Sequence, residues 1–77
     1  MTLCKYVVYY EYKTTTGGVH VNTVNVEILV DNSDSEEYTI YQVRQLVRHY
    51  CSEKHGVYQI LNITQVIDDV YGAVYES

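Results

Sequence analysis

The feature that most constrains this fold is a strict alternation of side chains in residues 23–31. β-Branched residues occupy every second position, and the positions between them are mostly polar. A period of two is typical of a strand with one buried face, so the stretch predicts a half-buried β-strand. His20 and Asn22 are polar where the same period would place apolar residues, which predicts a bulge or an overhang beyond the core. The positions expected to be buried are Val24, Val26, Ile28 and Val30.

A second run of strand composition comes before it, because residues 5–13 are dense in Val and Tyr and contain neither Gly nor Pro. Between the two runs, Gly17 and Gly18 allow the chain to reverse, so the pair predicts a β-hairpin. One face of the first run is more apolar than the other and is expected to meet the core. That face contains Tyr6, Val8, Tyr10 and Tyr12.

After a polar stretch the apolar spacing changes to steps of three and four residues. This period predicts an amphipathic helix from about Thr39 to His55. Gly56 fits the C′ position, and Lys54 and His55 fall in the last turn, where cations meet the negative end of the helix dipole. The apolar stripe contains Ile40, Val43, Leu46, Val47, Tyr50 and Cys51.

Residues 57–67 predict a third strand, with apolar side chains on both faces. Residues 69–77 are expected to form a tail or a short extra turn of helix that starts near Asp68, with Val70, Tyr71 and Val74 on one side. Strand directions then favour an α+β fold of ββαβ type, a three-stranded antiparallel sheet of order 2-1-3 with one helix packed on one face. At 77 residues, the whole chain 1–77 is expected to be a single domain.

The net charge of the chain makes some functional classes less favourable. Five basic and ten acidic side chains give a formal net charge of -5, which disfavours direct binding to nucleic acid and to anionic membranes. The sequence contains no membrane span and no secretory signal pattern, so we expect a cytoplasmic protein. Two cysteines, Cys4 and Cys51, are too few for a disulfide framework; the sequence leaves a single bridge between them open, and reduced thiols are expected.

No motif for a metal, a cofactor or catalysis is present. The acidic run Asp31, Asp34, Glu36 and Glu37 lacks the spacing of a calcium loop and is expected to be a solvated loop that also favours the helix N-terminus. The cysteines and histidines form no C-x-x-C pair. Cys51 and His55 lie one helical turn apart, but a helix C-terminus raises a thiol pKa, so a buried structural thiol and no enzymatic activity are expected.

The uncovered face of the sheet is the main feature for function. Tyr9 on that face resembles the stacking platforms of single-strand binders, but such platforms need a basic groove that the sequence does not provide. A protein partner is therefore favoured, contacted by this face and by the acidic groups around it. The predicted partner-binding residues are Val7, Tyr9, Glu11, Glu27, Asp31, Asp34, Glu36, Glu37, Asp68 and Asp69.

Four segments resemble short phage and mobile-element proteins of ββαβ type. They are the Tyr-rich run from Lys5 to Lys13, the pair Gly17-Gly18, the segment from Ile40 to His55 with Gly56, and Ile60-Leu61-Asn62-Ile63. The resemblance spans roughly residues 5 to 67. It implies a stoichiometric inhibitor of host defence, similar to anti-CRISPR proteins, that occupies a site on a large basic effector in the bacterial host cytoplasm.

Two functional hypotheses follow. The first is a phage-encoded inhibitor that binds a bacterial defence protein of CRISPR-Cas type or another nucleic-acid-handling protein. The second is a self-associating structural or accessory domain, because folded chains this short bury only about 60% of their unfolded surface and dimerisation is a common remedy. The two hypotheses are compatible, since an inhibitor can be a homodimer.

Overall fold

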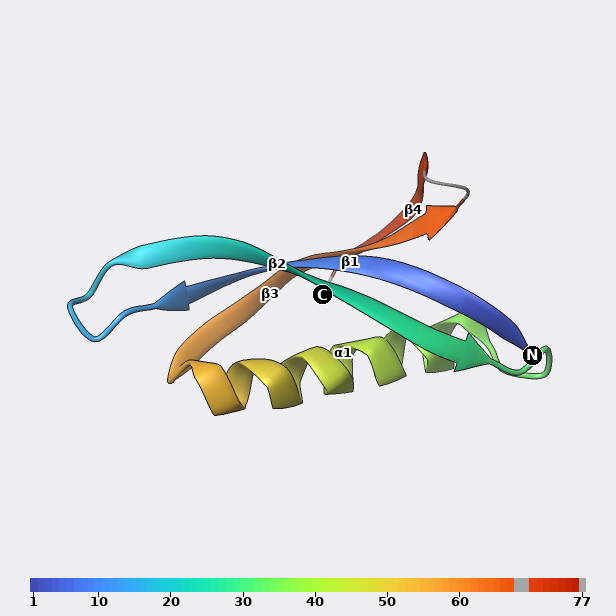
Figure 1. The fold of residues 1–77 in the computed structure, drawn as a ribbon, viewed down its shortest axis with the longest axis horizontal. Coiled ribbons are helices and arrows are strands. Elements are labelled where there is room, and N and C mark those ends of the chain that lie inside the picture. The colour runs from blue at the N-terminus through green and yellow to red at the C-terminus, as the bar shows by residue number, and fades with distance from the viewer. Residues whose placement is uncertain (68–69, 77) are drawn as a thin grey trace.

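The computed structural model describes residues 1–67 and 70–76 of the protein. The four strands form one antiparallel sheet in the order β2-β1-β3-β4, and the helix lies along one side of it (Figure 1). The α+β class, the ββαβ arrangement and the order 2-1-3 of the first three strands are therefore confirmed. The elements are β1 (Thr2–Lys13), β2 (Val19–Val30), α1 (Glu36–Lys54), β3 (Val57–Ile67) and β4 (Val70–Glu76).

The tail differs from the prediction. A helical turn after residue 68 is wrong for Val70–Glu76, which forms a fourth strand paired with β3. β3 has a free edge on the side away from β1, and its unpaired backbone groups can hydrogen-bond an antiparallel segment. Valine and tyrosine favour a strand, and Gly72 disfavours a helix. Asp68 and Asp69 lie outside the described residues.

The β1–β2 hairpin is regular throughout. Its register runs from Lys13 opposite Val19 to Thr2 opposite Val30 without a shift, so the irregularity predicted near His20 is an overhang and not a bulge. The overhang projects past the end of α1 (Figure 1). At its tip Gly17 has φ 88°, a left-handed conformation that glycine adopts without strain.

A bulge occurs instead in β3. The register with β1 shifts between Tyr9 opposite Asn62 and Tyr10 opposite Ile60, which leaves Leu61 as the extra residue. Because the shift reverses the alternation, Ile60 and Ile63 both face the helix, and both are buried. This phase change explains why the sequence of β3 shows apolar residues on both faces.

The helix begins three residues earlier than predicted. Ser35 is the N-cap, and its hydroxyl accepts a hydrogen bond from the Tyr38 N–H at 3.1 Å. Glu36 and Glu37 occupy the first turn, where negative charge is favourable, as the acidic run predicted. The helix ends at Lys54, and the His55 N–H closes it on the Cys51 carbonyl.

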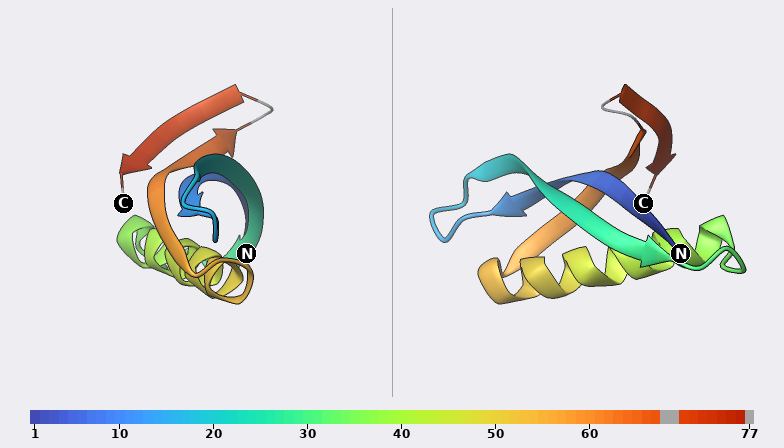
Figure 2. Two further views of the ribbon diagram at one scale, coloured as in Figure 1. Left: turned by 90° about the vertical axis from the view of Figure 1, so that its left-hand side faces the viewer. Right: turned by 45° about the vertical axis from the view of Figure 1, so that its right-hand side comes forward.

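One apolar core joins α1 to the near side of the sheet. The sheet is twisted and coiled, with α1 packed along one side of it (Figure 2). Burying each large apolar side chain of this kind contributes roughly 1.5–3 kcal/mol. The predicted core faces of the first strand and of the helix are confirmed except at Leu46, which is 51% exposed, and Tyr12 and Tyr50 are half-buried at the margin of the core. The buried core residues are Tyr6, Val8, Tyr10, Ile40, Val43, Val47, Cys51, Ile60 and Ile63.

Candidate protein-binding surface

The side of the sheet turned away from α1, here called the outer face, carries the side chains that alternate with the core. Strand register brings them together in rows across β2, β1 and β3. Lys13 lies between Val19 and Val57, and in the next row Glu11 lies between Val21 and Gln59. Near the hairpin, this face thus presents valines on both flanks of a charged central strand.

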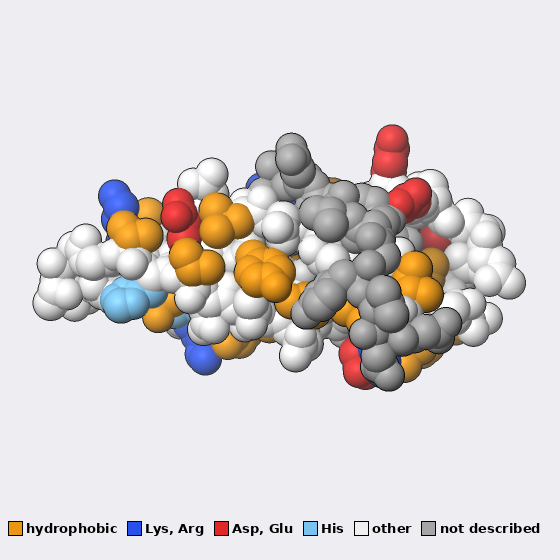
Figure 3. Space-filling view, turned by 90° about the horizontal axis from the view of Figure 1, so that it is seen from above, with side chains coloured by type: hydrophobic (Ala, Val, Ile, Leu, Met, Phe, Trp, Pro, Cys, Tyr) orange, Lys and Arg blue, Asp and Glu red, His pale blue; other side chains and the backbone are white. Residues whose placement is uncertain are grey.

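Exposed apolar residues gather over the hairpin half of this face. Val21 and Val57 expose 63% and 61% of their surface, Val19 exposes 56% and Leu61 exposes 39%. Figure 3 looks onto this face and shows hydrophobic side chains clustered there beside acidic and basic groups. We call this group the outer patch. It consists of Tyr9, which is half-buried, and of Val19, Val21, Val57 and Leu61.

The middle of the outer face is less open than the sequence predicts. Thr64 is only 5% exposed, and its backbone pairs with Val7 on one side and with Val74 of β4 on the other. Val7 is half-buried, and the side-chain oxygen of Asn62 is buried without a hydrogen-bond partner among the described residues. β4 makes β3 an interior strand, and the outer face is open again at the ends of β1 and β2 away from the turn, where Leu3 and Leu29 lie opposite each other and expose 51% and 61% of their surface.

Charges on the outer face nearly cancel. Among the described residues, β1 contributes Lys5, Glu11 and Lys13, and β2 contributes Glu27, which lies directly opposite Lys5. Arg44 and Arg48 lie elsewhere, on α1, along a groove of about 450 Å³ that β3 also lines. The outer face is therefore neither an anionic surface nor a basic channel for phosphates.

The acidic residues of the predicted site form a separate surface in the connection between β2 and α1. Asp31 Oδ1 accepts hydrogen bonds from the Ser33 N–H and hydroxyl, both at 3.1 Å, and Asp34 Oδ2 accepts one from the Asp31 N–H at 3.2 Å. These two carboxylates thus stabilise their own loop. Glu36 and Glu37 are exposed at the start of the helix.

The ten predicted partner-binding residues therefore do not form one site. Val7, Tyr9, Glu11 and Glu27 share the outer face, as predicted. The four acidic residues of the 31–37 stretch lie at the other end of the molecule, which measures 44 × 22 × 16 Å (Figure 1). Asp68 and Asp69 lie outside the described residues. The exposed valines of β2 and β3, which the sequence reasoning missed, are the better candidates for contact with a partner.

An aromatic cluster at the C-terminal end of α1 also escaped the sequence reasoning. Tyr12 stacks between His55, at a centroid distance of 3.9 Å, and His20, at 5.6 Å. The Tyr10 hydroxyl lies 3.3 Å from His55 Nε2 and accepts a hydrogen bond from Asn22 Nδ2 at 3.5 Å. The register of the hairpin, which pairs Tyr12 with His20 and Tyr10 with Asn22, was the signal in the sequence.

This cluster gives no sign of thiol chemistry. Cys51 is fully buried, and burial raises the pKa of its thiol, whereas a catalytic thiol needs a lowered pKa. His55, the base considered for it, packs on Tyr12 and contacts the Tyr10 hydroxyl. Both cysteines are free thiols. Burial also raises the pKa of Tyr10, with the nearby Tyr50 and Cys51 adding to the effect.

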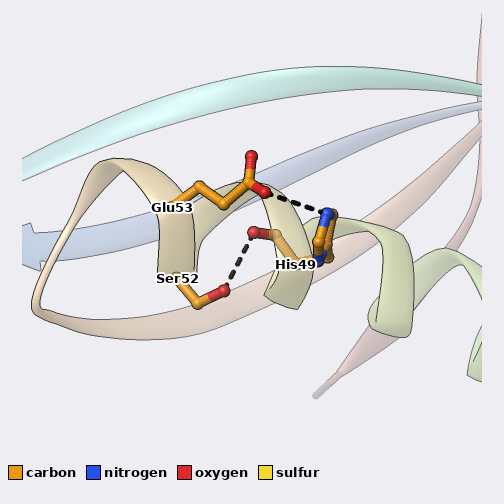
Figure 4. A network of polar contacts seen from close by, with 3 residues as sticks. All are labelled: His49, Ser52 and Glu53. Atoms are coloured by element: carbon orange, nitrogen blue, oxygen red, sulfur yellow. Dashed lines mark hydrogen bonds and ion pairs between the residues drawn. The ribbon is translucent and has the colours of Figure 1, made fainter.

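The other polar network on the helix is exposed. His49 Nε2 lies 3.2 Å from Glu53 Oε1, and the Ser52 hydroxyl donates to the His49 carbonyl at 2.9 Å (Figure 4). An exposed pair at i and i+4 contributes little, and the Ser52 hydroxyl is bonded to backbone and not to the imidazole. Among the described residues, no group of three His, Cys, Asp or Glu side chains lies together as metal ligands would.

The comparisons with known proteins give no relative. No family model, curated protein or solved structure matches the chain. The helix α1, in the described part of the chain, is too short or too polar to cross a membrane. What the fold and the surface define is a small α+β protein whose sheet carries exposed apolar side chains on its outer face.

Proposed function

We propose that this protein is a non-enzymatic inhibitor that binds a larger bacterial protein through the outer patch. The target class is a basic defence or nucleic-acid-handling effector, of CRISPR-Cas type in the leading version. The observation that carries the proposal is the set of exposed valines that flank Lys13 and Glu11 of β1 on the hairpin half of the outer face.

The composition of the patch suits a protein partner. Exposed aliphatic side chains and one tyrosine on the same face resemble the apolar part of a protein interface, and Glu11 and Lys13, which lie between the valines, can supply polar contacts. Exposed apolar side chains that gather on one face and are bordered by polar residues mark interaction sites on small domains. The patch also lies on rigid strands, which limits the ordering cost of binding.

Charge supports a basic target. The net charge of -5 creates a negative field, to which the exposed Glu36 and Glu37 contribute. Such a field speeds the encounter with a positively charged channel and competes there with phosphate. The resemblance to short phage proteins points to the same class of target.

A plaque assay tests the proposal in bacteria that carry an active CRISPR-Cas system. Expression of the protein is expected to restore phage plaque formation. Val57→Lys should abolish this effect, because a charge placed within the contact surface cannot be desolvated cheaply. Ser52→Lys, which adds the same charge on the exposed side of α1, should leave it intact. Equal activity of both variants, or no protection across several defence systems, would contradict the proposal.

The proposed role of negative charge in reaching a basic target is tested separately, by binding kinetics with the purified effector. Glu37→Gln removes one exposed carboxylate that makes no described loop contact, whereas Asp34 is bonded to its own loop. We expect Glu37→Gln to slow association a few-fold and to reduce its salt dependence, with dissociation unchanged. Association rates that are independent of salt in the wild type would remove the argument for a basic target.

A further inference from the structure

Strand β2 is an edge strand without the usual protection. It is the outermost strand of the sheet and pairs with β1 alone within the described part of the chain. It has twelve residues, pairs without a register shift, and contains no Lys, Pro or Gly. Natural sheets shorten their edges, bulge them or place Lys or Pro on them, because an unpaired strand recruits another strand.

The opposite edge shows the contrast. β4 has seven residues, and its pairing with β3 shifts between Thr64 and Val66. A short strand paired through an irregular register is a poor template for a further strand. The unprotected side of this sheet is therefore β2.

An uncharged groove lies next to this edge. It has a volume of about 510 Å³ and extends from Ile28 of β2 over the exposed side of α1. Its apolar wall includes Leu46, Tyr41 and Tyr38, which expose 51%, 56% and 48% of their surface. The rest of its lining is glutamine and His49, so the lining includes no Asp, Glu, Lys or Arg.

We propose that β2 and this groove bind a second copy of the same chain. Two β2 strands related by a two-fold axis run antiparallel, and each then supplies the backbone donors and acceptors that the other lacks. The two four-stranded sheets become one continuous sheet, with both helices on the same side and their grooves adjacent. Leu46 and Tyr41 of each copy then cover the junction below the paired edges.

Charge favours a second copy over a basic partner at this place. Two copies that each carry a net charge of -5 repel one another. This repulsion is weakest where the contacting surfaces lack acidic residues, and the lining of the groove contains none. Glu27 is the one residue among the Asp, Glu, Lys and Arg types in β2, and His20 lies outside the stretch that pairs in this register. A pairing centred on Val26 places Glu27 opposite Asn25 of the second copy and Val24 opposite Ile28, so no like charges meet.

The dimer leaves the outer patch available. Val19 and Val21 fall outside the paired stretch in this register, and the patch lies on the face away from the helices. Each dimer then presents two outer patches on one side. The edge proposal and the proposed target binding therefore depend on different residues.

Sedimentation velocity of the full chain between 10 and 300 μM, as orders of magnitude for a weak protein dimer, tests the inference. The wild type should sediment at about twice the monomer mass of 9.0 kDa. Leu46→Lys should halve the mass, since two lysines would face each other across the junction. Val57→Lys, of similar exposure on the outer patch, should remain dimeric. Circular dichroism melts check that both variants fold.

Amide hydrogen exchange locates the contact. Amides of β2 that point away from β1 should be protected in the wild type and lose at least tenfold of that protection in Leu46→Lys. A wild type that stays monomeric at the highest concentration would overturn the proposal. So would a dimer that survives Leu46→Lys, or β2 amides that gain protection only when a different protein is added.

Discussion

The two faces of the sheet use the same residue types for different purposes. On the face toward α1, valine, isoleucine and tyrosine side chains from β1 and β3 are sealed by the helix, and Val8 and Ile63 are fully buried. On the outer face, Val21 and Val57 stand exposed beside charged neighbours. Burial here is decided by what packs on a face and not by the composition of the strand.

The comparison of the two faces distinguishes residues that stabilise the fold from exposed residues that can contact a partner. Single exposed apolar side chains are ordinary in soluble proteins, but exposed valines on both flanks of β1 are a larger feature. The helix-facing side should be sensitive to every lost atom, whereas the hairpin half of the outer face should tolerate substitution and lose only binding.

The largest expected difference comes from two neighbours in β3. Ile63→Ala removes a fully buried side chain and should lower the free energy of unfolding by about 2–5 kcal/mol. Leu61→Ala, at the bulge, should cost no more than about 1 kcal/mol because Leu61 is already 39% exposed. Urea unfolding followed by circular dichroism measures both. Similar losses would mean that the outer face is packed like the core.

Alkaline pH should act on the helix-facing side. Burial is the first cause that raises the pKa values of the Cys51 thiol and of the Tyr6 and Tyr10 hydroxyls. Above their ordinary pKa values, 9.0 and 10.0, the unfolded chain releases these protons while the folded chain keeps them. Stability should therefore be constant with respect to these groups below pH 9 and fall as the pH rises beyond it.

Thermal melts from pH 8 to pH 11 measure this fall in Tm. Cys51→Ala should remove the part of the fall in Tm that begins near pH 9.0, and Tyr10→Phe should remove a part that begins near pH 10.0. Leu61→Ala, which removes no titratable group, is the control from the outer face and should leave the profile unchanged in shape. A profile that none of the helix-facing variants alters would mean that other groups cause the alkaline loss.

Local patterns were sufficient for most of the fold. Alternation around Val24 and the three- and four-residue steps from Ile40 report which face is buried, and these periods survive in the structure. β4 could not be predicted in this way, because the short apolar run around Gly72 fits a strand or a helical turn. Whether this run forms a strand or a helical turn depends on pairing with the free edge of β3, and the local sequence does not encode that pairing.

The candidate site was only partly predictable. The assignment of Tyr9 and Glu11 to the outer face follows from alternation and is confirmed. The exposed Val57 and Leu61 depend on the register of β3 and on its bulge, neither of which has a local signature. Likewise, the sequence shows that Asp34 is acidic but not that its carboxylate bonds to its own loop.

A smaller effect is expected from paired tyrosine variants. Tyr10→Phe removes the hydroxyl that contacts His55 and Asn22 and should cost about 1 kcal/mol. Tyr9→Phe should change the free energy of unfolding by less than about 0.5 kcal/mol, as is usual away from buried polar groups. Urea titrations of both variants compare them directly. If the two losses are equal, the Tyr10 hydroxyl does not stabilise the packing at the end of α1.

The smallest expected effect tests whether the outer face is solvated. Lys5 lies directly opposite Glu27 across β1 and β2, and both side chains are exposed. Lys5→Glu places two carboxylates opposite each other and should lower the free energy of unfolding by about 0.2–1 kcal/mol in low salt. In 1 M NaCl, where the Debye length is about 3 Å, the loss should largely disappear, because exposed charges are screened. A loss that persists in high salt would show that this pair is shielded from water, and the contrast between the two faces would then hold for the hairpin half alone.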